Sequence, residues 1–86
     1  MKVIKFAKTD GSCPPCNEVT KALDQAGVKY ETVNPFETED FELVLKHRIK
    51  NVPITILFDD EEKVLTRVAG VDERKLNRLI DMYNGE

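Results

Sequence analysis

The two cysteines of this chain stand in one short segment, Cys13-Pro14-Pro15-Cys16. The residues before this segment read as a strand over 2–7, and the apolar residues after it recur at helical spacing over 14–26. Proline suits the first helical position, because the N–H that it lacks would find no partner inside the helix. We therefore predict that a strand passes to a helix here, with both thiols at the start of the helix.

Strand and helix signals alternate along the rest of the chain. Apolar runs rich in β-branched residues predict further strands over residues 28–33, 54–58 and 63–69. Helical spacing predicts helices over 39–47 and after Asp72. The order β-α-β-α-β-β-α within 86 residues indicates one α/β domain, 1–86. The first two strand–helix steps favour parallel pairing and the last two strands an antiparallel hairpin. We therefore predict a four-stranded mixed sheet with helices on both faces.

The second and third predicted helices each have an apolar side that we expect to be buried. The side chains expected to face inward are Phe41, Val44 and Leu45 in the second helix, and Leu76, Leu79, Ile80 and Tyr83 in the third. Thr38 is the candidate cap of the second helix. His47 lies near the C-terminal end of that helix, where the dipole favours a cation, and we interpret it as a surface residue.

Composition argues against several classes of function. The net charge is -3 with no basic stripe, so we expect no nucleic-acid binding. No stretch approaches the roughly 18 consecutive apolar residues of a membrane helix. The first six residues lead directly into a strand without the apolar stretch of a signal peptide, which favours a cytoplasmic location. There, a lone C-x-x-C pair is more often catalytic or metal-binding than a structural disulfide.

A second motif follows the cysteine pair. The segment Ile49-Lys50-Asn51-Val52-Pro53 precedes the third strand and ends 37 residues after Cys16. Together with C-x-x-C at the first strand-to-helix turn, it resembles the thioredoxin/glutaredoxin superfamily over essentially the whole chain, in a minimal, glutaredoxin-sized version. The resemblance implies a thioredoxin fold, in which the residue matching Pro53 is a cis-proline beside the cysteines. A cis bond before proline costs only about 0.5–1 kcal/mol over trans.

The chain combines features of both subfamilies. Where thioredoxins carry a Trp, a buried acid and a Thr, this chain has Ser12, Ala7 and Ile54. By resemblance to glutaredoxins, Lys8, Gly70 and Asp72 are candidate glutathione contacts, although Ala69 replaces the first Gly of the glutaredoxin Gly-Gly pattern. The plain alternatives are a solvated charge for Lys8 and a helix cap for Asp72. The sequence therefore lies between the two subfamilies.

The residue types of the cysteine segment indicate thiol chemistry. With Cys13 as the N-cap residue, its sulfur faces the positive end of the helix, which stabilises thiolate over thiol. Neither Pro14 nor Pro15 has an N–H, so the amide of Cys16 is the main backbone donor expected at this sulfur, assisted by Asn17 and the Cys16 thiol. We predict that Cys13 is a moderately activated nucleophile. Cys16, shielded on the first helical turn, is the predicted resolving cysteine.

The resemblance implies a dithiol–disulfide oxidoreductase that reduces protein disulfides. A client segment would lie as an added strand against the backbone of Val52, with Pro53, Pro14 and Pro15 around it. Clients implied by the resemblance include ribonucleotide reductase, and the electron donor would be thioredoxin reductase or glutathione. We expect no tightly bound cofactor beyond the redox-active disulfide. Nothing in the sequence calls for more than a monomer.

Other interpretations of the cysteine pair stay open. The pair could be a structural disulfide or two unreactive thiols, and the fold could serve as a redox-inert binding subunit. A monomeric zinc site usually needs four ligands, and the chain offers two cysteines and one distant His47. An iron–sulfur cluster shared by two chains with glutathione, as in some glutaredoxins, is a further alternative. Cys13→Ser separates the enzyme from the inert subunit, and visible colour would indicate a cluster.

Overall fold

The computed structural model of the chain describes residues 1–39 and 41–85. Over these residues the elements are, in order, β1 (Lys2–Phe6), α1 (Pro14–Gln25), β2 (Glu31–Val33), α2 (Phe41–Lys46), β3 (Ile54–Phe58), β4 (Val64–Ala69) and α3 (Glu73–Tyr83). The predicted alternation of strands and helices is therefore confirmed.

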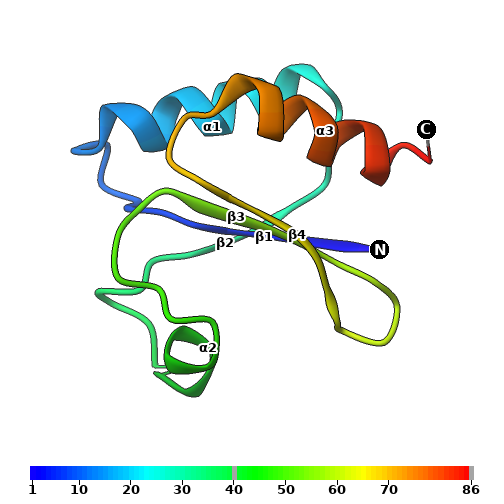
Figure 1. The fold of residues 1–86 in the computed structure, drawn as a ribbon. Coiled ribbons are helices and arrows are strands. Elements are labelled where there is room, and N and C mark those ends of the chain that lie inside the picture. Colours follow the sequence, from blue (N-terminus) through cyan, green and yellow to red (C-terminus); the bar gives the residue numbers. More distant parts are fainter. Residues whose placement is uncertain (40, 86) are drawn as a thin grey trace.

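The strands form one mixed sheet in the order β2-β1-β3-β4. β1 pairs in parallel with β2 and antiparallel with β3, and β3 pairs antiparallel with β4. Figure 1 shows α1 and α3 over one face of the sheet and α2 over the other. The predicted fold class, a four-stranded mixed sheet with helices on both faces, is confirmed.

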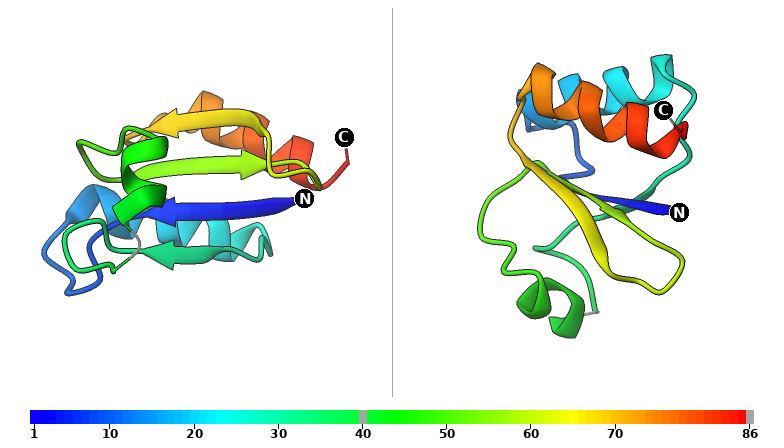
Figure 2. Two further views of the ribbon diagram at one scale, coloured as in Figure 1. Left: turned by 90° about the horizontal axis from the view of Figure 1, so that it is seen from below. Right: turned by 45° about the vertical axis from the view of Figure 1, so that its right-hand side comes forward.

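The prediction of parallel pairing is right for the first strand–helix step and wrong for the second. α2 has six residues. At a rise of about 1.5 Å per residue it spans only about 9 Å, which is too short to carry the chain back along a strand. Figure 2 shows α2 lying across the strands. The chain therefore re-enters the sheet at the end where β2 left it, with Ile54 paired to Phe6, and β3 runs antiparallel to β1.

Helices cover apolar side chains on both faces of the sheet. Because consecutive strand residues point to opposite faces, the interior strands β1 and β3 contribute to both sides. Toward α1 and α3 the buried cluster consists of Val3, Val19, Leu23, Val28, Leu57, Val68, Leu76 and Leu79. Toward α2 the buried cluster consists of Ile4, Phe6, Ile49, Ile54, Ile56 and Phe58. β3 is buried at all five of its positions.

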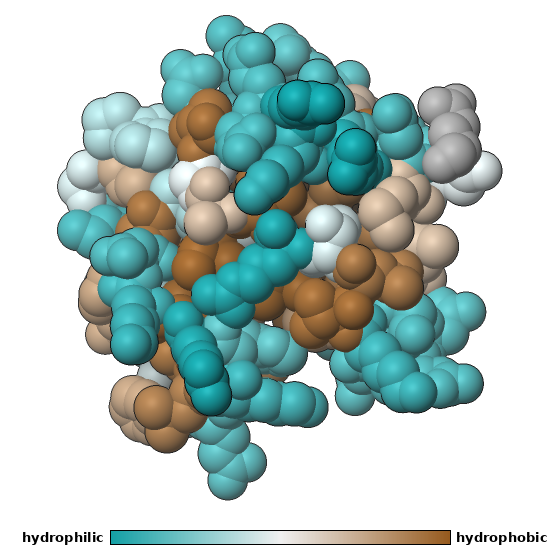
Figure 3. Space-filling model, in the orientation of Figure 1, coloured by the Kyte–Doolittle hydropathy of each residue, from teal (hydrophilic) through white to brown (hydrophobic). Residues whose placement is uncertain are grey.

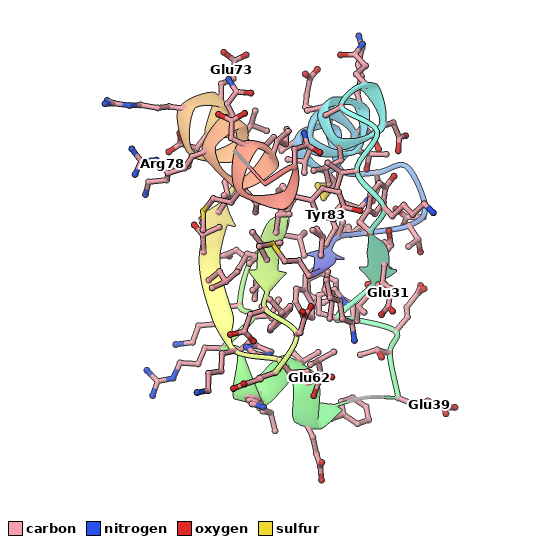
Figure 4. The ribbon with its side chains drawn as sticks, turned by 90° about the vertical axis from the view of Figure 1, so that its right-hand side faces the viewer. Glu31, Glu39, Glu62, Glu73, Arg78 and Tyr83 are labelled. Atoms are coloured by element: carbon pink, nitrogen blue, oxygen red, sulfur yellow. A yellow bond between two sulfur atoms is a disulfide. The ribbon has the colours of Figure 1, made fainter. Side chains whose placement is uncertain are left out.

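The inward stripe predicted for α3 is confirmed. Leu76 and Leu79 are buried, and Ile80 and Tyr83 pack against the same cluster. Figure 4 shows Tyr83 on the side of α3 that faces the sheet and Arg78 pointing away from it. The Tyr83 hydroxyl also accepts a hydrogen bond of 3.3 Å from the backbone N–H of Lys29, which ties α3 to the segment before β2.

The inward face predicted for α2 is partly wrong. Phe41 and Leu45 are exposed by 66% and 75%, whereas Val44 packs against the sheet together with Leu43. Four of the six residues of α2 are apolar, so the pattern allows more than one inward face, and a helix on a single sheet buries only one. The predicted start and cap of this helix include position 40, which lies outside the described residues. Thr38 as its cap therefore stays a prediction.

The surface keeps some apolar side chains exposed. Figure 3 shows them gathered across the middle layer of the molecule, over the edge strand β4, and in a smaller group over α2. Val64 and Leu65 are the exposed large apolar residues of β4. In the part of the chain that the structure describes, no helix has the length and the apolar character to cross a membrane.

His47 lies closer to the core than the sequence indicates. It follows α2, is half-buried, and its ring meets the Phe58 ring edge-on with centroids 5.2 Å apart. Burial holds the pKa of His47 below its ordinary value of 6.5, and the positive charges of Lys46 and Arg67 lower this pKa further. The interpretation as a surface cation at a helix end is therefore corrected, because the packing favours the neutral ring.

This packing predicts a pH dependence of stability. The unfolded chain binds the His47 proton more tightly than the folded chain does. The contribution of the neutral ring is therefore complete above about pH 6.5 and is lost as the pH falls through the folded pKa. We expect the denaturant midpoint of the wild type to fall from about pH 7 to about pH 5, and to fall less in His47→Gln. An equal fall of the denaturant midpoint in the wild type and in His47→Gln would contradict the assignment of this pH dependence to His47.

Candidate active site

The start of α1 holds the two cysteines as a disulfide. Cys13 is the N-cap residue with an extended backbone, and Pro14 and Pro15 occupy the first two helical positions. Cys16 follows on the first turn, and its Cα lies 5.2 Å from that of Cys13. The helix begins where the sequence predicts, because proline fills positions at which a backbone N–H would have no helical partner.

The backbone amides at this helix start divide between sulfur and oxygen. The Cys16 N–H donates to the Cys13 sulfur over 3.2 Å, as predicted from the two prolines. The Asn17 N–H, which we expected at the same sulfur, instead donates to the carbonyl oxygen of Cys13 over 3.1 Å. That bond is the first i→i+4 bond of the helix, so helix formation takes the donor. Among the described contacts, a single backbone amide is therefore placed to stabilise the thiolate that Cys13 would form on reduction.

The two cysteines differ in exposure. Cys13 is partly exposed, whereas Cys16 is exposed by only 1%. Pro14 and Pro15 are exposed beside Cys13 and offer apolar surface to an approaching chain. Because thiol–disulfide exchange needs access to the attacking sulfur, this arrangement suits attack by Cys13 and internal resolution by Cys16.

The second motif reaches the same end of the sheet. The Val52–Pro53 peptide bond is cis, the geometry that the family resemblance implies. The following residue, Ile54, pairs with Phe6 at the end of β1, and β1 leads into the loop that carries the cysteines. Pro53 is buried and Val52 is partly exposed. Figure 1 shows the start of β3 and the start of α1 at the same, left-hand end of the molecule.

The segment before Pro53 is held in place by β4. The guanidinium group of Arg67 donates to the carbonyl oxygens of His47 and Arg48, which follow the last turn of α2. Arg48 has a backbone φ of +52°, in the left-handed region that commonly ends helices. Charge-assisted hydrogen bonds of this kind are stronger than neutral ones. β4 thereby fixes the path of the chain from α2 toward Pro53.

The three residues that the resemblance matches to glutathione contacts have different roles in the structure. The Gly70 N–H donates to the carbonyl oxygen of Pro53 over 2.8 Å, so the two residues are neighbours. Asp72 caps α3 by accepting from the Lys75 N–H over 3.1 Å. Lys8 is exposed, and its Nζ lies 5.6 Å from the ring centroid of Phe36. A contact of any of them with glutathione stays a prediction.

A local turn shapes the loop that leads to Cys13. One carboxylate oxygen of Asp10 accepts from the backbone N–H of Ser12 over 2.9 Å and from its hydroxyl over 2.6 Å. These hydrogen bonds lower the pKa of Asp10 from its ordinary value. Gly11, between the two, has a φ of +82°, which side chains other than glycine rarely tolerate. The turn directs the chain from β1 to the N-cap position.

Two buried polar residues that lie in the sheet beneath α1 were not predicted from the sequence. Lys5 and Thr55 are the polar side chains buried among the described residues, with exposures of 5% and 0%. They stand opposite each other in the β1–β3 pairing, on the face that α1 covers. The missed signal was position: β1 and β3 are interior strands with helices on both faces, so every residue of β3 and every residue of β1 after Lys2 is buried.

Metal-binding groups do not gather in the described part of the chain. Over residues 1–39 and 41–85, no three His, Cys, Asp or Glu side chains come together in a way that could hold a metal ion. His47 packs against Phe58 on the face of the sheet that α2 covers, whereas the cysteines lie at the start of α1 on the opposite face.

Fold and site together define a class, a thioredoxin fold with a C-x-x-C pair at the start of its first helix. No protein-family model matches the chain. The SPbeta prophage-derived thioredoxin-like protein YosR of Bacillus subtilis is 30% identical to it over 80 residues, which cover 93% of this chain and 95% of that protein. The chain therefore belongs to the thioredoxin-like family.

Solved structures agree with this assignment of the fold. Thioredoxin f2 of Chlamydomonas reinhardtii matches with a TM-score of 0.74 and 22% identity, over 98% of this chain and 79% of that one. The glutaredoxin-like protein NrdH-redoxin of Escherichia coli matches with a TM-score of 0.68 and 20% identity, over 92% and 95% of the two chains. The family, the fold and the bonded cysteine pair support a function in thiol–disulfide redox chemistry.

Proposed function

We propose that the protein is a dithiol–disulfide oxidoreductase that reduces disulfides in client proteins. The observation that carries the proposal is the asymmetry of the Cys13–Cys16 pair. Cys13 is accessible at a helix N-terminus with an amide on its sulfur, and Cys16 is buried within bonding distance behind it. A structural disulfide needs neither this exposure nor this position.

The reaction follows from that asymmetry. In the reduced protein the Cys13 thiolate attacks one sulfur of the client disulfide and forms a mixed disulfide, while the other client sulfur leaves as a thiolate and takes up a proton. Cys16 then loses its proton and attacks the Cys13 sulfur. The Cys13–Cys16 bond forms, the bond to the client breaks, and the second client thiol is released. Two electrons have passed from the protein to the client.

The position of Val52 supports binding of an extended client segment. It is partly exposed, stands directly before the cis-proline and lies at the sheet end where the cysteines are. An extended segment there would add main-chain hydrogen bonds to its N–H and C=O groups, with Pro14 and Pro15 as apolar neighbours. Ribonucleotide reductase, which oxidises a cysteine pair in each turnover, is the client class we propose.

The electron donor is the second part of the proposal, and we favour a flavoprotein thioredoxin reductase over glutathione. Ala69 stands where the glutaredoxin pattern has its first glycine, and Asp72 is engaged as a helix cap. NrdH-redoxin of Escherichia coli is a glutaredoxin-like protein with a thioredoxin-like activity profile. We extend that combination to this chain, in a reducing cytoplasmic setting and as a monomer.

The donor is tested by coupled turnover. NADPH oxidation is followed with insulin as the disulfide substrate, once with a thioredoxin reductase and once with glutathione and glutathione reductase. We expect turnover with the first system and little above background with the second. Turnover only with glutathione would reverse the choice of donor. Absence of turnover with both, and also with dithiothreitol as the reductant, would favour the redox-inert binding subunit.

A further inference from the structure

Lys5 is a charged side chain in a place where charges are rarely found. It stands in the interior strand β1 and is exposed by only 5%. The ion pairs between described residues join other groups, at the N-terminus and at the β3–β4 turn, so Lys5 has no carboxylate partner at salt-bridge distance there. Burying an ammonium group without such a partner is costly. Because this burial destabilises the fold, we looked for a functional role of the Lys5 charge.

The hydrogen bonds of Lys5 lead to the backbone of the resolving cysteine. The Lys5 ammonium group donates to the hydroxyl oxygen of Thr20, and that hydroxyl donates to the backbone carbonyl of Cys16 over 3.0 Å. A threonine hydroxyl has one proton, so its donation to Cys16 leaves only its oxygen for Lys5. The direction of donation is therefore fixed: Lys5 donates to Thr20, and Thr20 donates to Cys16.

The remaining neighbours of Lys5 include an aromatic ring and a more distant carboxylate, but no carboxylate bonded to it among the described residues. The Lys5 Nζ lies 4.5 Å from the ring centroid of Tyr30, and the Tyr30 hydroxyl donates to Asp24 over 2.7 Å. Burial lowers the pKa of Lys5 from its ordinary value, and attraction by the Asp24 carboxylate opposes this shift. From β3, Thr55 faces Lys5 in the strand register, and its buried hydroxyl has no hydrogen-bond partner among the described residues.

We propose that Lys5 is a positioning residue of the redox site, whose charge, held behind the first turn of α1 by Thr20, stabilises the thiolate that Cys16 forms when it resolves the mixed disulfide. Thr20 is four residues after Cys16 and therefore lies on the same face of the helix, one turn on. Because the Lys5 side chain is largely shielded from solvent, its charge acts on a nearby thiolate more strongly than it would in water.

The inference rests on the proposed function and assigns one step of it. When Cys16 resolves the mixed disulfide, its thiol gives its proton to water and its sulfur bonds to Cys13. The client sulfur leaves Cys13 as a thiolate and takes a proton from water, so charge and protons balance. Lys5 keeps its own proton throughout and acts only on the charge of Cys16. The effect is reciprocal, because a Cys16 thiolate also favours the charged form of Lys5.

The test is a titration of Cys16 that needs no client. In a Cys13→Ser background, the ultraviolet absorbance of the thiolate reports the ionisation of Cys16 across pH. Lys5→Met removes the charge and keeps an unbranched side chain. We expect it to lower the thiolate population of Cys16 about three- to tenfold at any pH below the midpoint. Thr20→Val, which keeps Lys5 and removes only the connecting hydroxyl, is expected to shift the midpoint in the same direction by less.

Two controls keep the proposal open to refutation. Thr55→Val alters a buried hydroxyl opposite Lys5 without altering any charge, and we expect it to leave the midpoint unchanged. Replacing a buried charge by an apolar side chain is often neutral or stabilising, so we expect Lys5→Met to fold. If Lys5→Met does not fold, the titration midpoint of Cys16 in Thr20→Val alone decides the test. An unchanged Cys16 midpoint in the folded Lys5→Met protein, or in Thr20→Val when that variant decides, would overturn the inference.

The same variants separate this inference from the proposed function. If the wild type reduces insulin and Lys5→Met titrates like the wild type, only the role of Lys5 falls. If the wild type reduces no disulfide, the proposed function falls, whatever the titration of Cys16 shows.

Discussion

Cys13→Ser is expected to reduce the rate of insulin-disulfide reduction to that of the uncatalysed reaction. Serine keeps the N-cap geometry, since its hydroxyl accepts from the Cys16 N–H as the sulfur does. The fold should therefore survive while the only accessible thiol of the pair is lost. Activity is measured with insulin and dithiothreitol, and folding by the denaturant midpoint of the variant against that of the reduced wild type.

Cys16→Ser is the matched variant and should fail in a different way. It keeps the Cys13 nucleophile and removes the group that resolves the mixed disulfide. We expect the protein to accumulate as a covalent adduct with one client chain, seen as an increase in mass that dithiothreitol reverses. If Cys16→Ser formed no adduct and Cys13→Ser formed one, the roles of the two cysteines would have to be exchanged.

Leu23→Ala is expected to destabilise the protein by about 3–5 kcal/mol. Leu23 is fully buried on α1 in the cluster beneath the helices that carry the site. Its removal leaves a cavity in a cluster built from β1, α1, β3, β4 and α3, which close-packed neighbours fill only in part. Small domains have a free energy of unfolding of about 5–15 kcal/mol, so this substitution would remove a large share of it.

Leu45→Ala provides the control for that loss. It makes the same chemical change on another helix, at a side chain exposed by 75%. We expect a change within about 0.5 kcal/mol. The two free energies of unfolding come from urea titrations of the oxidised proteins. Equal effects at the two positions would contradict the description of the core.

The cysteine site could be predicted from the sequence because its geometry is local. Proline at the first two helical positions fixes where α1 begins, and the N-cap position of Cys13 and the amide of Cys16 follow from that. The cis bond before Pro53 rests instead on the resemblance to a family. Its place beside the site depends on the pairing of Ile54 with Phe6, which joins distant parts of the chain.

The features that the sequence did not predict depend on long-range packing. The outward direction of Phe41 and Leu45 follows from which face of a short apolar helix meets the sheet, and this pattern allows several. The burial of Lys5 and Thr55 follows from the place of β1 and β3 inside a sheet covered on both faces. A lysine between apolar strand residues gives no such signal until the strand order is known.

The central claim is that Cys13 and Cys16 form a reversible redox pair. The most direct measurement equilibrates the protein with a graded series of reduced and oxidised glutathione and counts free thiols by mass after alkylation. We expect one two-electron transition with a potential of about -230 mV or lower, on the reducing side of the glutaredoxins. A potential of about -150 mV or higher would reverse the proposed direction of electron flow. A pair that formed no disulfide in any of these buffers would contradict the claim itself.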